Sequence, residues 1–216
     1  MENKHQVHNL IILDESGSMD SIKNTIISGF NELVQTIHGI EKKFPDQEHY
    51  ISFISFNGLS NKVLHFMEPA QNLKQIDAKS YYPDANTPLF DAMGYSINKL
   101  KQALQGKSNY NVLVTVMTDG EENASEEFSG NAIKNLVEEL KQNFWTFTYI
   151  GTDHDVEKIA SALSINNTLK FEKNESNIEF MFARESKARF SFSSKIHNKK
   201  DISTNYFDAD DEEESK

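Results

Sequence analysis

Residues 10–18 of the 216-residue chain, LIILDESGS, lead from an apolar run directly into an acidic loop that is rich in hydroxyl groups. The apolar run covers residues 7–13 and has the pattern of a strand that is buried on both faces. Strands of that kind are typical of parallel sheets with helices on both sides. Because the run stops at Asp14, we expect the functional loop to begin where this strand ends.

Strands and amphipathic helices alternate along the chain that follows. Apolar residues recur at helical spacing over residues 21–44, and Pro45 follows as a stop signal. Residues 51–56 and 63–67 predict two strands. The turn signal Asn57-Gly58 between them indicates antiparallel pairing, with the second strand at a sheet edge.

The second half of the chain repeats this alternation. A helix over residues 88–104 is predicted to start at Pro88, because proline lacks only an N–H that the first helical position does not use. Further expected elements are the strands 112–117, 145–150 and 168–171 and the helices 133–140, 156–163 and 176–196. The order predicts an α/β, Rossmann-like fold: a doubly wound, mainly parallel six-stranded sheet with one antiparallel edge strand and helices on both faces.

The composition suits a single domain, since 38% of the residues are hydrophobic. We expect this domain over residues 1–196 and a polar, then acidic tail over residues 197–216, disordered beyond about Asn205. The chain has no cysteine, which excludes disulfides, thiolate zinc sites and a cysteine nucleophile. No signal sequence or membrane-spanning run is evident, so a cytoplasmic location is expected.

The formal net charge is -11, and residues 208–216 alone hold six acids and one lysine. A negative surface repels phosphate backbones and anionic lipid headgroups, so nucleic acids and membranes are not expected as partners. Cations and basic proteins are favoured instead. The sequence does not indicate an oligomeric state.

Two acids at strand ends define the candidate site. In a parallel α/β sheet, ligands bind outside the carboxyl ends of the strands, so Asp14 and Asp119 are expected to be neighbours. Asp14, Ser16 and Ser18 place one carboxylate and two hydroxyls on a tight loop that contains Gly17. Such an oxygen cluster suits a hard cation, and its few carboxylates match Mg²⁺.

Three separated motifs carry a resemblance to a known family. Residues 14–19 (DESGSM), 86–89 (NTPL) and 118–121 (TDGE) resemble, in the same order, the metal-ion-dependent adhesion site (MIDAS) of von Willebrand factor A domains. The first motif is similar to those of small stand-alone bacterial members. The chain departs from the family pattern at Ala85-Asn86, where many members carry glycines; asparagine tolerates positive φ better than most residues.

The resemblance implies a ligand set and an ion. Ser16 and Ser18 would coordinate the ion directly, and Asp14 directly or through water. Thr87 and Asp119 would exchange direct and water-mediated contacts. The ion would be Mg²⁺, with Mn²⁺ or Ca²⁺ as alternatives.

Each candidate also has a plain structural interpretation. Thr87 could cap the helix that begins at Pro88, Ser18 or Asp20 could cap the helix that begins near Ser21, and Asp119 precedes a turn glycine. The three glutamates beside the motifs are expected to form a solvated acidic rim; they are Glu15, Glu121 and Glu122. An exposed pair among Phe180, Phe182, Phe190 and Phe192 could mark a protein interface.

Three functions fit these observations. We expect a non-catalytic, metal-dependent interaction module that binds an acidic side chain of a protein partner, within a bacterial multi-protein assembly. The enzymatic alternative is a Mg²⁺-dependent phosphotransferase or phosphatase, which needs a second acid near Asp14 and a lysine. Ser16 stands at the second-acid position, and no lysine closely follows Leu13, Met117 or Ile150. The third function is a scaffold whose metal only stabilises it.

Overall fold

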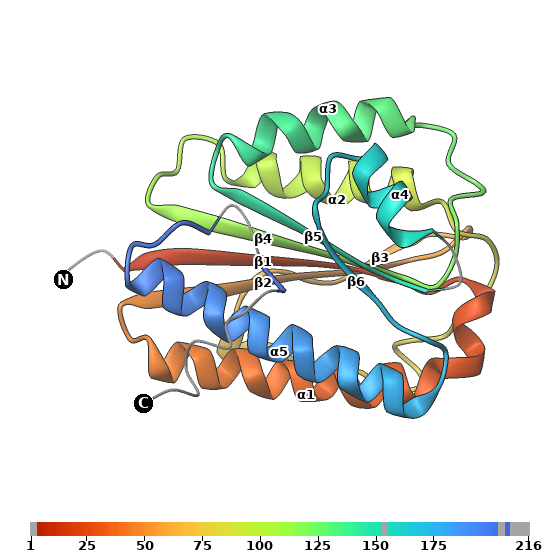
Figure 1. The fold of residues 1–216 in the computed structure, drawn as a ribbon, viewed down its shortest axis with the longest axis horizontal. Helices are drawn as coiled ribbons and strands as arrows, with labels where there is room; N and C mark the ends of the chain where they lie inside the picture. The colour runs from red at the N-terminus through yellow and green to blue at the C-terminus, as the bar shows by residue number, and fades with distance from the viewer. Residues whose placement is uncertain (1–3, 153–154, 203–205, 208–216) are drawn as a thin grey trace.

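The computed structural model describes residues 4–152, 155–202 and 206–207 and contains a six-stranded sheet in the order β3-β2-β1-β4-β5-β6 (Figure 1). All neighbouring strands are parallel except β3, which pairs antiparallel with β2 at one edge. This confirms the predicted topology. The strands are β1 His5–Asp14, β2 Gln47–Phe56, β3 Asn61–Pro69, β4 Tyr110–Thr118, β5 Trp145–Gly151 and β6 Asn167–Lys170.

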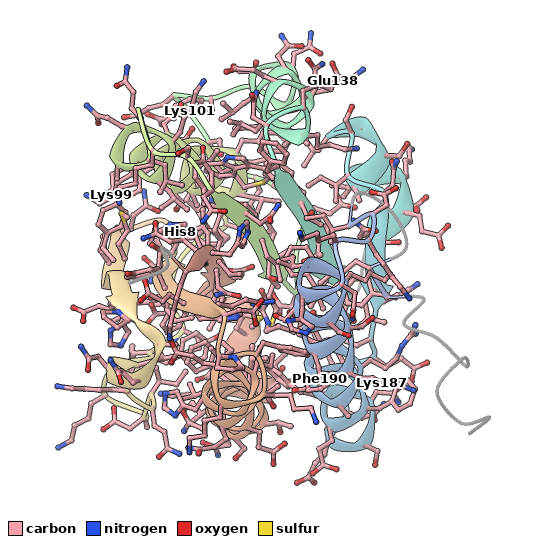
Figure 2. The ribbon with its side chains drawn as sticks, turned by 90° about the vertical axis from the view of Figure 1, so that its left-hand side faces the viewer. His8, Lys99, Lys101, Glu138, Lys187 and Phe190 are labelled. Atoms are coloured by element: carbon pink, nitrogen blue, oxygen red, sulfur yellow. The ribbon has the colours of Figure 1, made fainter. Side chains whose placement is uncertain are left out.

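Five α-helices cover the two faces of the sheet. Helices α1 and α5 lie on one face, and α2, α3 and α4 lie on the other, as the view along the strands also shows (Figure 2). Their bounds are α1 Lys23–Lys43, α2 Leu89–Ala103, α3 Gly130–Lys141, α4 Val156–Ala162 and α5 Glu175–His197; two short 3-10 helices, η1 Gly17–Ile22 and η2 Ala70–Asn72, complete the set. None of the helices in the described ranges is long and apolar enough to cross a membrane.

The central strand β1 contributes side chains to the hydrophobic cores on both faces of the sheet. Leu10 and Ile12 belong to the core under α2 and α3, whereas Ile11 and Leu13 belong to the core under α1 and α5. Successive side chains of a strand point to opposite faces, so an uninterrupted apolar run fills both layers. The run delivers Asp14, the last residue of β1, to the carboxyl edge of the sheet.

Helix α2 starts one residue later than expected, because Pro88 is its N-cap and Leu89 its first residue. The backbone N–H groups of its first turn are satisfied from a distant loop. Phe90 N donates to Glu122 Oε2 at 2.8 Å, and Asp91 N donates to Ser125 Oγ at 3.0 Å. The loop after β4 therefore holds the start of α2 in place.

Tyr206 packs against α5 and the sheet, in a hydrophobic cluster with Phe192, Val7 and Leu113. Tyr206 is 4% exposed, and its hydroxyl donates to Glu185 Oε1 at 3.2 Å. Most of the expected disordered tail, residues 208–216, lies outside the described residues. On α5, Phe180 and Phe190 are exposed while the other two phenylalanines, Phe182 and Phe192, are buried.

Candidate metal centre

Three loops meet at the carboxyl ends of β1 and β4. Leu13 and Met117 are register partners in adjacent parallel strands, so the residues that follow them, Asp14 and Thr118, leave the sheet side by side. Between them in the sequence, a second loop runs into α2 and presents Thr87, which is buried. This is the edge at which the sequence predicts a ligand site.

The Asp14 carboxylate is fully buried and both of its oxygens accept hydrogen bonds. Ser16 N donates to Oδ1 at 2.7 Å, and Thr118 Oγ1 donates to Oδ2 at 2.6 Å. Burial raises the pKa of the Asp14 carboxyl to about 6, and these two hydrogen bonds act in the opposite direction. Thr118 supports the candidate site residue Asp14 and was not among the site residues predicted from the sequence, although it stands directly before Asp119 in the third motif.

The hydroxyl groups connect the first loop to the third. Ser16 Oγ and Ser18 Oγ lie 3.2 Å apart, and Ser18 Oγ donates to Asp119 Oδ1 at 2.6 Å. A Cβ added at Gly120 would lie 3.6 Å from Thr87 Oγ1 and 3.8 Å from Ser18 Oγ, so these two hydroxyls flank the same glycine. The structure thus brings together all five residues that the sequence singles out.

The capping interpretations do not hold for these side chains. The N-cap of α2 is Pro88, not Thr87, and the N-cap of α1 is Ile22, with no side-chain hydrogen bond. Asp119 bonds to Ser18 across the site. The hydroxyl and carboxylate oxygens are therefore directed toward one another.

Asp119 provides the test of whether this cluster suits a metal. Its side chain is inaccessible to solvent, and the only contact of its Oδ2 atom within the described ranges is an ion pair. An ammonium group, Lys173 Nζ, lies 3.0 Å from that oxygen as an ion pair. A buried carboxylate oxygen that faces a cation, among three hydroxyls and a second carboxylate, is a donor set that fits a hard divalent ion.

Among the residues that the structure describes, no three His, Cys, Asp or Glu side chains cluster as metal ligands. Any ion at this edge of the sheet would therefore depend on the hydroxyl groups of serine and threonine. Hydroxyl ligands carry no charge, so the ion would keep attraction for a further anionic ligand.

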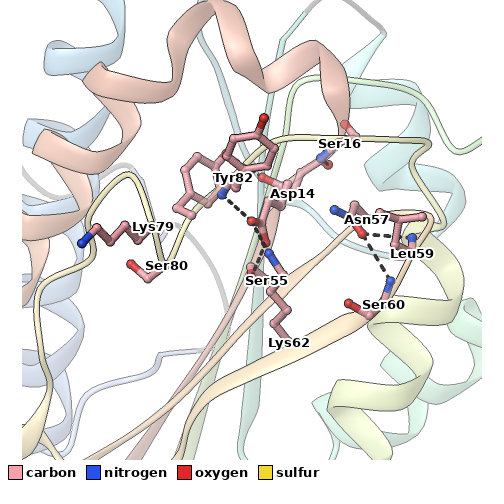
Figure 3. Close-up of polar contacts among 12 residues, drawn as sticks. Asp14, Ser16, Ser55, Asn57, Leu59, Ser60, Lys62, Lys79, Ser80 and Tyr82 are labelled. Carbon is pink, nitrogen blue, oxygen red and sulfur yellow. Dashed lines mark hydrogen bonds and ion pairs between the residues drawn. The ribbon is translucent and has the colours of Figure 1, made fainter.

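The expectation of a solvated acidic rim is wrong for Glu15. Its side chain is fully buried and accepts hydrogen bonds from Ser55 Oγ at 2.7 Å, from Lys62 Nζ at 2.6 Å and from the backbone N–H of Tyr82. Figure 3 labels these three donor residues. Strands β2 and β3 and the loop before α2 enclose the carboxylate from three sides. Glu15 therefore anchors the first loop to its neighbours and is not available as a ligand.

The other two acids of that rim differ from each other. Glu121 is exposed, as expected. Glu122 is half-buried and accepts hydrogen bonds from the backbone N–H groups of Phe90, Ala124 and Ser125. Glu122 is a structural residue of the third loop.

The loop before Thr87 contains a positive φ although it has no glycine. Ala85, not Asn86, has a positive φ of 61°. The Ala85 carbonyl accepts a hydrogen bond from Gly17 N at 3.0 Å, which ties this loop to the first motif. The positive φ therefore falls on Ala85, one residue before Asn86, although asparagine tolerates this conformation better than alanine.

Comparison with known proteins supports the resemblance. The profile of one family, the von Willebrand factor type A domain, matches residues 10–203. No curated protein matches the chain.

Many solved structures share the fold at low sequence identity. The von Willebrand factor type A protein from Catenulispora acidiphila is 14% identical with a TM-score of 0.56; the match covers 85% of this chain but only 42% of the other. The vWF domain of the type V pili tip protein Mfa5 from Porphyromonas gingivalis is 11% identical with a TM-score of 0.61, covering 94% and 99%. Manganese-loaded TRAP protein from Plasmodium vivax is 19% identical with a TM-score of 0.53, covering 82% and 73%.

Proposed function

The chain belongs to the von Willebrand factor type A domain family, and on that premise we propose that it is a metal-dependent protein-interaction module. The divalent ion would be held by the five residues of the cluster, Asp14, Ser16, Ser18, Thr87 and Asp119. The ion would supply a positive centre for an acidic side chain of a protein partner. Chemistry on the partner is not part of this function.

The observation that carries the proposal is the 2.6 Å hydrogen bond from Ser18 Oγ to Asp119 Oδ1. It joins two loops that sequence motifs mark independently, and neither side chain caps a helix. The hydroxyls of Ser16 and Ser18 offer free lone pairs, whereas both Asp14 oxygens already accept hydrogen bonds. Asp14 is therefore suited to a water-mediated contact or to use of its remaining lone pairs.

The charge of the ligand set supports an interaction role. Two carboxylates only neutralise a divalent ion, so a third carboxylate from outside can still bind in place of water. Mg²⁺ is the expected ion, with Mn²⁺ and Ca²⁺ as alternatives; the manganese in the Plasmodium vivax structure is consistent with a divalent ion at such a fold. A bacterial multi-protein assembly remains the proposed setting.

The acidic surroundings of the site favour a partner whose acidic side chain is flanked by basic residues. Glu121 is exposed on the loop that follows β4 and adds negative potential near the proposed ion. A partner acid flanked by lysine or arginine should therefore bind better than one flanked by acids. Two peptides of these kinds, compared at low ionic strength, test the idea, and equal affinities would contradict it.

For the phosphotransferase alternative, the described residues provide a lysine near the site but no accessible nucleophile with a second acid beside it. Lys173, which follows β6, provides the lysine next to Asp119 that the sequence reading did not find. The candidate nucleophile Asp14, however, is fully buried with both oxygens engaged, and the position of a second acid is held by Ser16. These contacts favour binding over phosphoryl transfer.

The test is direct measurement of metal binding by isothermal titration calorimetry with Mn²⁺ and Mg²⁺. Ser18→Ala should weaken binding at least tenfold because it removes a proposed ligand. The matched control is Ser21→Ala, which removes an exposed hydroxyl whose contact is a 3.4 Å bond to the Ser18 carbonyl. If Ser18→Ala and Ser21→Ala bind the ion equally well, the ligand set is wrong.

Phosphate release from p-nitrophenyl phosphate that is lost in Asp14→Asn would support the enzyme instead.

A further inference from the structure

Lys173 lies in the segment that connects β6 to α5, next to the N-cap residue Asn174. Its Nζ atom is 3.0 Å from Asp119 Oδ2, and the two side chains are 24% and 0% exposed. A cation from a fourth segment of the chain thus reaches the carboxylate that the metal proposal assigns to the ion. The first three segments carry the recognised motifs, whereas Lys173 belongs to none of them.

We propose that Lys173 is a built-in competitor of the divalent ion for Asp119. The inference rests on the proposed metal site, but it concerns a residue outside the ligand set. In the absence of the ion, the ammonium neutralises the buried carboxylate. When the ion binds, the ammonium must withdraw from Asp119 Oδ2.

The two side-chain contacts that Asp119 makes with described residues differ in how they tolerate a metal. Ser18 donates a proton to Asp119 Oδ1, and its oxygen still has lone pairs for an ion, so that hydrogen bond can remain. An ammonium group has three donors and no lone pair, so Lys173 cannot become a ligand. It also repels a divalent ion a few ångströms away, and burial of the carboxylate limits the screening of this repulsion.

The geometry of the segment permits withdrawal without rearrangement of α5. Asn174 caps the helix, since its side chain accepts a hydrogen bond from Asn177 N at 3.0 Å. The backbone next to Lys173 is therefore held, while the lysine side chain has a flexible four-carbon stem. The lysine side chain can therefore move away from Asp119 while the backbone beside it stays in place.

The first test compares Mn²⁺ affinity by calorimetry in the full chain. Lys173→Met should lower the dissociation constant about tenfold, because the competing charge is gone. Lys173→Arg keeps the charge and should bind no more tightly than wild type. The control for a general loss of positive charge is Lys23→Met, whose ammonium lies 4.5 Å from the Tyr82 ring centroid. Unchanged or weaker Mn²⁺ binding by Lys173→Met would overturn the proposal.

Thermal unfolding gives a second, independent readout. In EDTA, Lys173→Met should melt below wild type because Asp119 loses its counter-ion. In saturating Mn²⁺ this difference should vanish or reverse. A melting difference that is the same with and without Mn²⁺ would assign Lys173 a purely structural role.

The outcomes separate this inference from the proposed function. If Lys173→Met gains Mn²⁺ affinity but neither it nor wild type binds acidic peptides in Mn²⁺, the competitor role stands and the partner chemistry fails. If neither protein binds Mn²⁺ at millimolar concentration, both proposals are overturned.

Discussion

Ser18 and Asp119 are 101 residues apart in the sequence, and the Ser18 hydroxyl donates to the Asp119 carboxylate at 2.6 Å. The contact crosses from the loop after β1 to the loop after β4. Adjacent parallel strands end at the same edge of the sheet, so their following loops come together without any special arrangement of the chain. What the hydrogen bond adds is orientation, because it directs a hydroxyl and a carboxylate toward a common point.

The hydrogen bond from Thr118 to the buried Asp14 carboxylate leads to a prediction about stability. Thr118→Val removes the hydrogen bond to Asp14 Oδ2 and leaves a buried carboxylate oxygen without its donor. Hydrogen bonds to charged groups contribute about 1.5 to 3 kcal/mol, so the free energy of unfolding should fall by about that amount. Urea denaturation measures the change. The control is Thr148→Val, which removes a 3.3 Å bond to the neutral Val114 carbonyl, and an equal loss in both variants would contradict the special role of Thr118.

The positive φ of Ala85 predicts a stabilising substitution. Residues other than glycine lose about 1 to 2 kcal/mol in left-handed conformations, whereas glycine loses about 0.5 to 1 kcal/mol in backbone entropy. With φ at 61°, Ala85→Gly should raise the free energy of unfolding by about 0.5 to 1 kcal/mol. Ala183→Gly, at an exposed position in the middle of helix α5, should lower it by about 0.5 to 1 kcal/mol. Thermal denaturation of the two variants checks the sign of the change in stability. Destabilisation by Ala85→Gly would show that the positive φ of Ala85 is not strained.

Replacement of glycine by alanine is expected to have opposite effects on stability at two positions of α1, Gly29 and Gly39. A Cβ at Gly29 would overlap the Phe182 ring on α5, whereas a Cβ at Gly39 would meet nothing within 4 Å. Gly29→Ala should destabilise the protein by about 1 to 3 kcal/mol through overpacking. Gly39→Ala should stabilise it by about 0.5 to 1 kcal/mol, because alanine is the better helix former. Chemical denaturation of both variants is the measurement, and a stable Gly29→Ala protein would mean that α1 and α5 separate easily.

Buried His49 predicts that stability falls at acidic pH. Burial, together with the positive charge of Arg189, lowers the pKa of His49 from 6.5 to about 3. Below pH 6.5 the unfolded chain binds a proton that the native state does not, so stability is complete above pH 6.5 and decreases as the pH falls toward 3. His49→Gln removes this proton linkage.

The measurement is the free energy of unfolding of both proteins at pH 8 and at pH 4. Between pH 8 and pH 4, the free energy of unfolding of the variant should fall by about 3 kcal/mol less than that of wild type. His49 Nδ1 faces the Asn9 amide and Nε2 faces Gln47 Oε1, a pattern that suits the neutral ring. Parallel pH profiles would show that His49 is protonated in the native state.

Features that depend on neighbouring residues could be predicted from the sequence. The uninterrupted apolar run of β1, the helical spacing of α1 and the order of elements sufficed for the parallel sheet and its antiparallel edge. The two-residue spacing of Asp14, Ser16 and Ser18 indicated one oxygen-rich loop. The strand before Asp119 indicated that Asp119 would lie at the same edge of the sheet as this loop. These predictions succeed because strand periodicity, loop length and the ligand site at strand ends follow from local chain geometry.

Only the tertiary structure determined which charged groups face the site. Glu15 has the same charge as Glu121, yet it is buried by Ser55 and Lys62 while Glu121 is exposed. Lys173 looks like an ordinary surface lysine in the sequence, and its ion pair with Asp119 exists only because the segment after β6 passes the end of β4. Burial and ion pairing depend on distances between segments remote in sequence, and a local pattern carries no information about those distances.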